Sequence, residues 1–256
     1  KNEKILKGVL KEFRKIGYVM HVRVMSAENY GVPQKRRRTI FIGNRIGYAT
    51  EFPIPTHGKS EKLKPLVTIG DAIGNMKIKN GEILNHDVEA AKISKELIRN
   101  RVEKVPEGKG IRYKEDERAY LPKKLWLGVD WDTIGEGRLR EEQYHRLGRD
   151  EVAPTIMTSR HTYFHPTETR YLTCREAAAI QSFPNNYKFV GSIAQQWRQI
   201  GNAVPPLLGK AIGKAILKSL KTKKKATTLE SQVIRQNAFS YEKDLTKDLL
   251  PLTKFA

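Results

Sequence analysis

The chain has 256 residues, of which 39% are hydrophobic, so it is long enough to bury a core in one or two domains. Its 48 lysines and arginines outnumber its 28 acidic residues, and the net charge of +20 favours a polyanionic partner such as nucleic acid. The sequence has neither an apolar run of the roughly 20 residues that span a bilayer nor the apolar stretch of a signal peptide, so we expect a cytoplasmic protein. The single cysteine, Cys174, excludes a disulfide framework and a cysteine-based zinc site.

The first 50 residues predict a helix and two strands. Apolar residues recur at helical spacing over Lys4–Ile16, and Gly17 suits the end of that helix. Tyr18–Met25 is rich in β-branched and aromatic residues, and after a turn a second strand is expected over Gln34–Gly43. This order is typical of the trailing edge of an α/β sheet.

The rest of the chain is less regular. Residues Ile69–Thr155 combine short mixed segments with scattered Gly and Pro, which indicates an irregular second domain. A short helix is expected over Glu176–Ser182, and a longer one over Val204–Leu217. The lysine-rich stretch Lys218–Lys225 leads into a polar tail, and a solubilising extension explains it better than a dedicated phosphate contact.

Residues 29–38 combine a turn with a run of basic residues that follows it. Their sequence is Asn-Tyr-Gly-Val-Pro-Gln-Lys-Arg-Arg-Arg. Side chains on a strand alternate between faces, so we expect Gln34, Arg36 and Arg38 on one face. Guanidinium groups in such a row suit bidentate bonds to phosphate oxygens and base acceptors. A solvated basic edge strand that discourages aggregation explains the pattern equally well.

Two later segments contain helix-capping signals. Residues 170–184 are Arg-Tyr-Leu-Thr-Cys-Arg-Glu-Ala-Ala-Ala-Ile-Gln-Ser-Phe-Pro, in which Thr173 and Glu176 predict a capping box. Residues 199–206 are Gln-Ile-Gly-Asn-Ala-Val-Pro-Pro, where Gly201 permits a tight turn and Asn202 suits the cap of the next helix. The N–H groups at the start of that helix favour a carboxylate or phosphate.

Together and in this order, the three segments resemble motifs eight, nine and ten of the DNA cytosine-5 methyltransferases. The matching family patterns are Gln-x-Arg-x-Arg, then Arg-x-Leu-Thr-x-Arg-Glu with Gln-x-Phe-Pro, then Gln-x-Gly-Asn-Ala-Val. The resemblance covers about residues 1–220. It implies an α/β fold that combines the trailing part of a Rossmann-like S-adenosylmethionine-dependent methyltransferase sheet with a smaller, mixed and irregular target recognition domain.

The resemblance also divides the chain. It implies C-terminal strands of the catalytic domain at 1–52, a recognition domain at 53–190, a helix returning to the catalytic domain at 191–220 and a basic C-terminal extension at 221–256.

The chemistry of this family needs a cysteine thiolate, which adds to C6 of cytosine before C5 accepts the methyl group. The family carries it in a Pro-Cys dipeptide, together with a Glu-Asn-Val segment and a glycine-rich loop for S-adenosylmethionine, and this sequence contains none of the three. Cys174 is expected to be a packing residue. The chain therefore resembles the C-terminal, DNA-recognition half of a methyltransferase, inactive alone and partnered by an N-terminal catalytic half, in cis or as a separate subunit.

The resemblance assigns roles to particular residues. Those that would support the catalytic loop and contact the flipped cytosine and a nearby phosphate are Gln34, Arg36 and Arg38. Those that would complete the S-adenosylmethionine pocket are Gly201, Asn202 and Ala203. Flipping is needed because the ring atoms attacked are hidden in the stack of double-stranded DNA.

The recognition region is expected between about Asn85 and His165. Four DNA-binding candidates in or beside it are Thr155, Ile156, Arg160 and Arg170. Further candidates for guanine edges or phosphates, each explained better as ordinary surface charge, are Arg138, Arg140, Arg146 and Arg149. His161 and His165 lack a third ligand, so we expect no metal site.

Two other functions fit the same sequence. A non-catalytic DNA-binding module would keep sequence specificity without methylation, although such a module has no use for the Gly201–Asn202 turn. The related transfer-RNA methyltransferases share the fold, but the complete Gln-x-Arg-x-Arg pattern and the long recognition region favour DNA, within a restriction–modification system.

Overall fold

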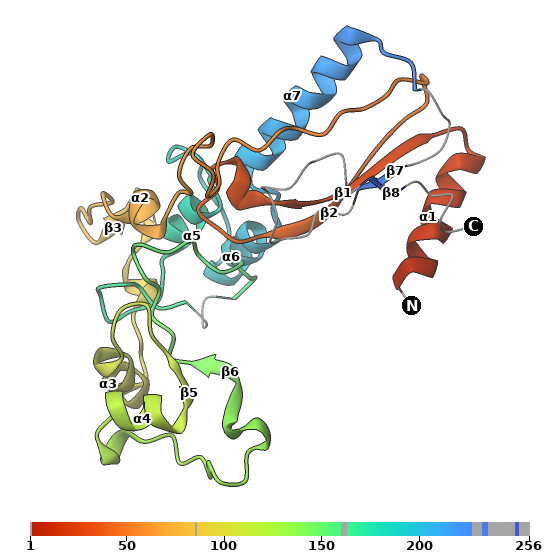
Figure 1. The fold of residues 1–256 in the computed structure, drawn as a ribbon. Helices are drawn as coiled ribbons and strands as arrows, with labels where there is room; N and C mark the ends of the chain where they lie inside the picture. Colours follow the sequence, from red (N-terminus) through yellow and green to blue (C-terminus); the bar gives the residue numbers. More distant parts are fainter. Residues whose placement is uncertain (1, 85, 160–162, 227–231, 235–248, 251–256) are drawn as a thin grey trace. The chain divides into compact units, whose positions relative to one another are not determined.

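The computed structural model describes residues 2–84, 86–159, 163–226, 232–234 and 249–250 (Figure 1). The chain divides into two compact units. Unit 1 comprises Lys1–Gly31, Lys35–Leu66 and Pro206–Ala256, and unit 2 comprises Val32–Gln34 and Val67–Pro205. The chain passes between the units near residues 66 and 205, and residues 32–34 also belong to unit 2.

Unit 1 is built around a four-stranded sheet in the order β2-β1-β7-β8. Strand β1 is antiparallel to β2, from the pair Val19 and Asn44 to the pair Ser26 and Arg37, and it is parallel to β7. The elements of this unit are α1 (Asn2–Lys15), β1 (Val19–Ser26), the 3-10 helix η1 (Ala27–Tyr30), β2 (Arg37–Asn44), α7 (Pro206–Thr222), β7 (Gln232–Ile234) and β8 (Leu249–Leu250).

The predicted helix at the start of the chain is confirmed as α1. Its Leu10 is buried against Met20 and Val22 of β1, with Leu6 packed beside them. The other apolar residues of α1, among them Ile5, Val9 and Phe13, stay exposed. Figure 1 shows α1 beside the strands of unit 1. Gly17 ends the helix with φ of +86°, a conformation that costs little only for glycine.

One expectation for unit 1 needs correction. The second strand begins at Arg37 rather than at Gln34, because Gln34 pairs with Ala153 in unit 2. The basic extension expected at 221–256 includes β7 and β8, which add to the sheet of unit 1. Residues 227–231, 235–248 and 251–256 of that extension lie outside the described residues.

Unit 2 consists of short elements, as the irregular sequence predicts. Its strands form two separate pairs, β3 with β4 and β5 with β6. Its helices and strands are α2 (Ile69–Ile73), β3 (Glu82–Ile83), β4 (His86–Asp87), α3 (Glu96–Lys104), β5 (Ile111–Tyr113), α4 (Lys114–Tyr120), β6 (Arg138–Gln143), α5 (Cys174–Ile180) and α6 (Ile193–Asn202). Its 3-10 helices are η2 (Glu89–Ala91), η3 (Lys123–Leu125) and η4 (Gly135–Gly137).

The main core of unit 2 lies among α2, α5 and α6. Helix α5 begins with the predicted capping box, in which Thr173 and Glu176 satisfy each other's backbone N–H groups. A second capping box, between Ser192 and Gln195, begins α6. Fully buried side chains that share this core include Ile69, Leu147, Ile156, Ala177, Ile180 and Ile200.

The third motif differs from its prediction. Asn202 is the last residue of α6 rather than the cap of the following helix, and Gly201 lies inside α6 rather than in a turn. Helix α7 begins at Pro206, a position where proline fits because its missing N–H would have no partner there. No helix in the described part of the chain is long and apolar enough to cross a membrane.

Candidate functional site

Two buried glutamines join the first motif to the second and third. Gln34 is fully buried, and its Oε1 accepts a hydrogen bond from the backbone N–H of Ile156 at 2.8 Å. Its Nε2 donates to Oε1 of Gln181 at 2.9 Å, and Nε2 of Gln181 donates to the carbonyl of Ile200 at 2.8 Å. We call Gln34 and Gln181 the glutamine relay; it connects residues 155–156, the end of α5 and α6.

The Thr155–Ile156 element is held from its other side by an aromatic hydroxyl. Tyr163 Oη donates to the carbonyl of Thr155 at 2.7 Å and accepts from the N–H of Met157 at 2.8 Å. The Tyr163 ring stacks on Trp197 of α6, with ring centroids 6.1 Å apart. The side chain of Ile156 is fully buried, whereas that of Met157 is 57% exposed. Met157, the residue after the predicted pair Thr155 and Ile156, therefore presents its side chain to the surface.

Gly201 of α6 packs directly against the backbone of residues 157–158. A Cβ atom at Gly201 would overlap the backbone oxygen of Met157 and would lie 2.7 Å from the nitrogen of Thr158. The absence of a side chain thus allows α6 to approach residues 157–158 closely. Asn202, one position later, is exposed.

The three residues of the Gln-x-Arg-x-Arg pattern do not share one exposed face. Gln34 and Arg36 precede β2, and both are buried, with Arg36 only 5% exposed. Arg38 lies on β2 with an exposed side chain whose Nη1 donates to the carbonyl of Arg37 at 2.7 Å. Of the three, Arg38 presents a charge that an external phosphate can reach.

Arg170 is enclosed by carboxylates. It is 5% exposed, and its guanidinium donates to both oxygens of Glu176 at 2.8 Å, to both oxygens of Glu168 and to the carbonyl of Tyr171. Burial alone would raise the pKa of Glu176, but the bonds from Arg170 outweigh it and lower that pKa to about 2. These contacts favour a positioning role for Arg170 over contact with DNA.

Other basic candidates of the recognition region differ in their surroundings. Arg149 donates to both carboxylate oxygens of Glu107, at 3.0 Å from Nε and 3.0 Å from Nη2 to the nearest oxygens. Arg146 is 7% exposed, and burial lowers its pKa. Arg140 is exposed on β6. Arg160 lies outside the described residues.

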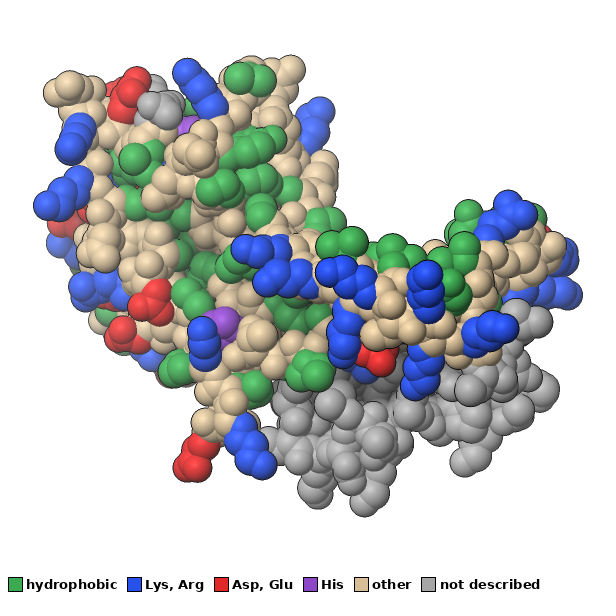
Figure 2. Space-filling view, turned by 90° about the horizontal axis from the view of Figure 1, so that it is seen from above, with side chains coloured by type: hydrophobic (Ala, Val, Ile, Leu, Met, Phe, Trp, Pro, Cys, Tyr) green, Lys and Arg blue, Asp and Glu red, His purple; other side chains and the backbone are tan. Residues whose placement is uncertain are grey.

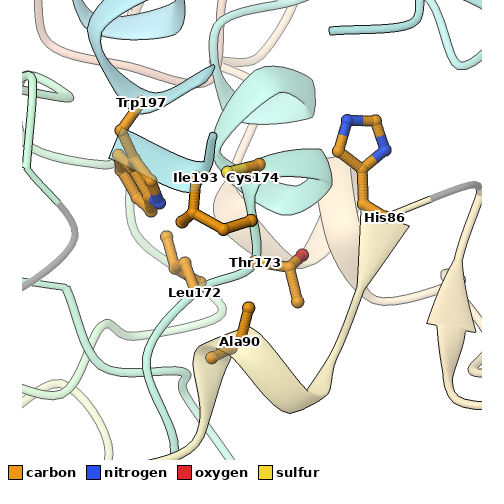
Figure 3. Close-up of a pocket in the computed structure, with 8 residues that line it drawn as sticks. His86, Ala90, Leu172, Thr173, Cys174, Ile193 and Trp197 are labelled. Carbon is orange, nitrogen blue, oxygen red and sulfur yellow. The ribbon is translucent and has the colours of Figure 1, made fainter. Parts of the chain in front are cut away.

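The cysteine is a core residue, as expected. Cys174 is 4% exposed and belongs to the main core of unit 2. It borders a cavity of about 10 Å³ that holds no more than a water molecule (Figure 3). The lining side chains labelled there are His86, Ala90, Leu172, Thr173, Cys174, Ile193 and Trp197. Among the described residues, no group of three His, Cys, Asp or Glu side chains could hold a metal ion.

Unit 1 carries a larger open groove beside α7, of about 470 Å³. Its apolar lining includes Phe52, Pro53, Ile54, Leu207, Ala211 and Ala215. Lysines spaced one helical turn apart also line it, namely Lys210, Lys214 and Lys218. Figure 2 shows lysine and arginine side chains next to hydrophobic ones over α7. We call this site the α7 groove.

The segments that make these contacts lie within a match to a known family. The model of the C-5 cytosine-specific DNA methylases matches residues 1–218. The chain belongs to this family. The C-5 cytosine methylase resemblance identified from the three motifs is thereby confirmed at the level of the family.

Curated relatives are methyltransferases of restriction–modification type by name. The type II methyltransferase M1.HphI of Haemophilus parahaemolyticus is 35% identical over 214 residues, which are 82% of this chain and 51% of that relative. The type II methyltransferase M.NgoFVII of Neisseria gonorrhoeae is 31% identical over 254 residues, or 96% of this chain and 62% of that relative. The chain thus spans between half and two thirds of the length of these relatives.

A solved structure shares the fold. It is a prophage-encoded E. coli chain assigned to the DNA modification methyltransferases, with a TM-score of 0.55 and 19% sequence identity. The match covers 82% of this chain and 64% of that one. Together with the helices and strands observed, it supports the α/β class predicted from the sequence.

Proposed function

We propose that this chain is the DNA-recognition half of a DNA cytosine-5 methyltransferase in a restriction–modification system. In the complete enzyme, a methyl group passes from S-adenosylmethionine to C5 of a flipped cytosine in double-stranded DNA. The observation that carries the proposal is the family match over residues 1–218, which includes all three motifs. On this proposal, unit 1 holds the trailing strands of the catalytic sheet, and unit 2 is the target recognition domain.

The two units would do different work on DNA. The side chain of Arg38 is exposed and would contact a phosphate or the O2 acceptor of the flipped base. Gln34 and Arg36 are buried and would hold the segment around it in place. In unit 2, the exposed Arg140 would approach the DNA backbone or a guanine edge. Arg160 is retained as a candidate from the sequence.

The third motif fits S-adenosylmethionine in part. Asn202 is exposed and Val204 is 59% exposed, so an amide and an apolar surface face outward where the family holds its cofactor. Gly201 is committed to the contact with Met157, and the backbone N–H of Ala203 donates to the carbonyl of Ile200 at 3.2 Å. Asn202 would therefore make the main contact from this chain. When bound, the cofactor supplies the electrophilic methyl group.

The thiolate that the reaction needs would come from another polypeptide segment. Cys174 is buried in a core and cannot reach a substrate base. We propose a complementary catalytic part, in cis or as a separate subunit, equivalent to the length of the relatives that this chain does not span. The α7 groove supports this partner, because it combines an apolar lining with lysines that favour acidic side chains. Leu207, Leu217 and Leu220 of α7 are also 39%, 59% and 44% exposed.

The proposal is tested by purifying the protein from its own cells and identifying its companions by native mass spectrometry. The purified material is then incubated with double-stranded DNA and S-adenosylmethionine carrying a labelled methyl group. We expect a polypeptide with a Pro-Cys dipeptide to accompany the chain and labelled 5-methylcytosine to form. Sequence-specific binding without methyl transfer would instead favour the non-catalytic DNA-binding module. Transfer to RNA or to another acceptor would contradict the proposal.

A further inference from the structure

The backbone of residues 155–158 is fixed at four points within unit 2. The N–H of Ile156 donates to Gln34, and Tyr163 bonds both the carbonyl of Thr155 and the N–H of Met157. The carbonyl of Met157 lies against Gly201, where a Cβ atom would not fit. A short segment without regular secondary structure is thus held by hydrogen bonds and packing from three separate parts of the unit.

The fixed backbone buries one side chain and leaves the three that follow it exposed. Ile156 is fully buried in the main core, whereas the next residues, Met157, Thr158 and Ser159, are exposed. Because the Met157 side chain is 57% exposed, it contributes little to the packing of the core. Its apolar side chain suits contact with a thymine methyl group, and the hydroxyl of Thr158 suits a base edge.

The glutamine relay has one direction of hydrogen bonding. Gln34 uses its oxygen for Ile156 and its nitrogen for Gln181, and Gln181 uses its oxygen for Gln34 and its nitrogen for Ile200. Both side chains are fully buried, so water cannot replace a lost partner without rearrangement. Changing Gln181 therefore withdraws support from residue 156 through Gln34, although Gln181 itself makes no bond to that residue.

We propose that Gln181 is a positioning residue for sequence recognition, acting through Gln34 to place Met157 and Thr158 against the DNA. The proposal rests on the proposed function and extends it, because it names the side chains that discriminate between sequences and the residue that fixes them. Ile156, predicted as a DNA contact, becomes instead the buried anchor of the segment.

The test compares variants of the protein expressed in its own cells and purified with any polypeptide that accompanies it. Each is mixed with a pool of randomised DNA duplexes, and the enriched sequence is determined. Dissociation constants are then measured for that sequence and for a scrambled duplex. Amide hydrogen exchange of Ile156 and Met157 is followed in parallel. The variants are Met157→Ala, Gln181→Met, Gln34→Met and the double glutamine variant.

We expect Met157→Ala to lower discrimination between the two duplexes by about tenfold, the usual effect of losing one base contact, with unchanged amide exchange. Gln181→Met should lower discrimination by about tenfold and speed the exchange of both amides. Because the relay acts as one chain, the double variant should be no worse than either single variant. The matched control is Gln196→Met, which removes an amide bond to the carbonyl of Gly191 elsewhere on α6 and should change neither readout.

The outcomes separate this inference from the proposed function. If the unmodified protein enriches no sequence, the proposed function fails, and amide exchange still decides whether the relay fixes residues 156–157. If it enriches a sequence but Gln181→Met keeps full discrimination and slow exchange, the positioning role is wrong. Should Gln181→Met not fold, Gln181→Asn serves instead, because it keeps an uncharged amide that is one methylene too short to bond both Gln34 and Ile200.

Discussion

The carboxylate of Glu176 accepts hydrogen bonds from both terminal nitrogens of Arg170, each at 2.8 Å. The same carboxylate accepts from the backbone N–H and the hydroxyl of Thr173, the N-cap residue of α5. Glu176 is 1% exposed, so this ion pair is buried. Glu176 is also one of the two residues of the capping box. Arg170 and Glu176 of the second motif therefore stabilise the fold of unit 2.

Removing the Glu176 carboxylate should be costly. Glu176→Gln leaves the buried Arg170 with a single carboxylate partner, and breaking a buried pair typically destabilises by about 3 to 5 kcal/mol. The free energy of unfolding from urea titration measures the loss. Glu168→Gln is the matched control, because Glu168 is 47% exposed on its side chain and should contribute less than about 1 kcal/mol. Equal losses in the two variants would show that burial of the pair is unimportant.

The ion pair between Arg170 and Glu176 also predicts that the stability of the protein depends on pH. Glu176 has an ordinary pKa of 4.5, which the folded protein lowers to about 2. A carboxyl whose pKa is lower in the folded state stabilises the protein above its unfolded pKa and loses that contribution as the pH falls. We expect melting temperatures to fall between about pH 4.5 and about pH 2 and the Glu176→Gln variant to show a shallower fall. Parallel profiles for the two proteins would contradict the assignment.

The capping box shows what the sequence predicts well. Thr173 and Glu176 are three residues apart, and their bonds depend only on local backbone geometry, so the pattern identifies the start of α5. The α1 stripe and β1 were predicted for the same reason of local periodicity. The relay between Gln34 and Gln181 was not, because its partners are 147 residues apart and a polar side chain in a sequence does not reveal whether it is buried.

The third motif shows the limit of local patterns. A glycine followed by asparagine is typical of a turn and a helix cap, but here both residues end α6. The capping box at Ser192 and Gln195 signals the start of α6 and could have revealed the helix. The contact between Gly201 and Met157 could not have been found from the sequence, since it depends on how α6 packs against a distant segment.

That contact gives a sharp prediction. Gly201→Ala places a methyl group against the Met157 backbone, which cannot move as a flexible side chain would, and overpacking of this kind costs about 1 to 3 kcal/mol. Gly213→Ala is the control, because Gly213 lies inside α7 with no atom within 4 Å of an added Cβ. Alanine is the better helix former, so this variant should gain about 0.5 to 1 kcal/mol. Thermal unfolding measures both changes, and opposite signs are required.

Strand β6 offers a comparison of two arginines for DNA binding. Arg140 is exposed, whereas Arg138 pairs with Glu136. Arg140→Ala should weaken DNA binding and reduce the slope of log K against log salt by about 1, the value for one phosphate contact. Arg138→Ala should have a smaller effect because its charge is already partly neutralised. Fluorescence anisotropy over a series of salt concentrations measures the slopes, and a slope for Arg140→Ala equal to that of the unmodified protein would exclude Arg140 as a phosphate contact.

Arg36 and Arg38 should separate stability from catalysis. Arg36 is 5% exposed, so Arg36→Ala removes packed atoms before β2 and should lower the free energy of unfolding by more than about 1 kcal/mol. Arg38 is exposed, and Arg38→Ala should leave stability within about 0.5 kcal/mol. In the assembled enzyme, Arg38→Ala should lower kcat for methyl transfer more than it raises the dissociation constant for DNA, because the flipped base is held only during the reaction. A uniform loss of DNA affinity with unchanged turnover at saturation would instead identify Arg38 as a phosphate anchor.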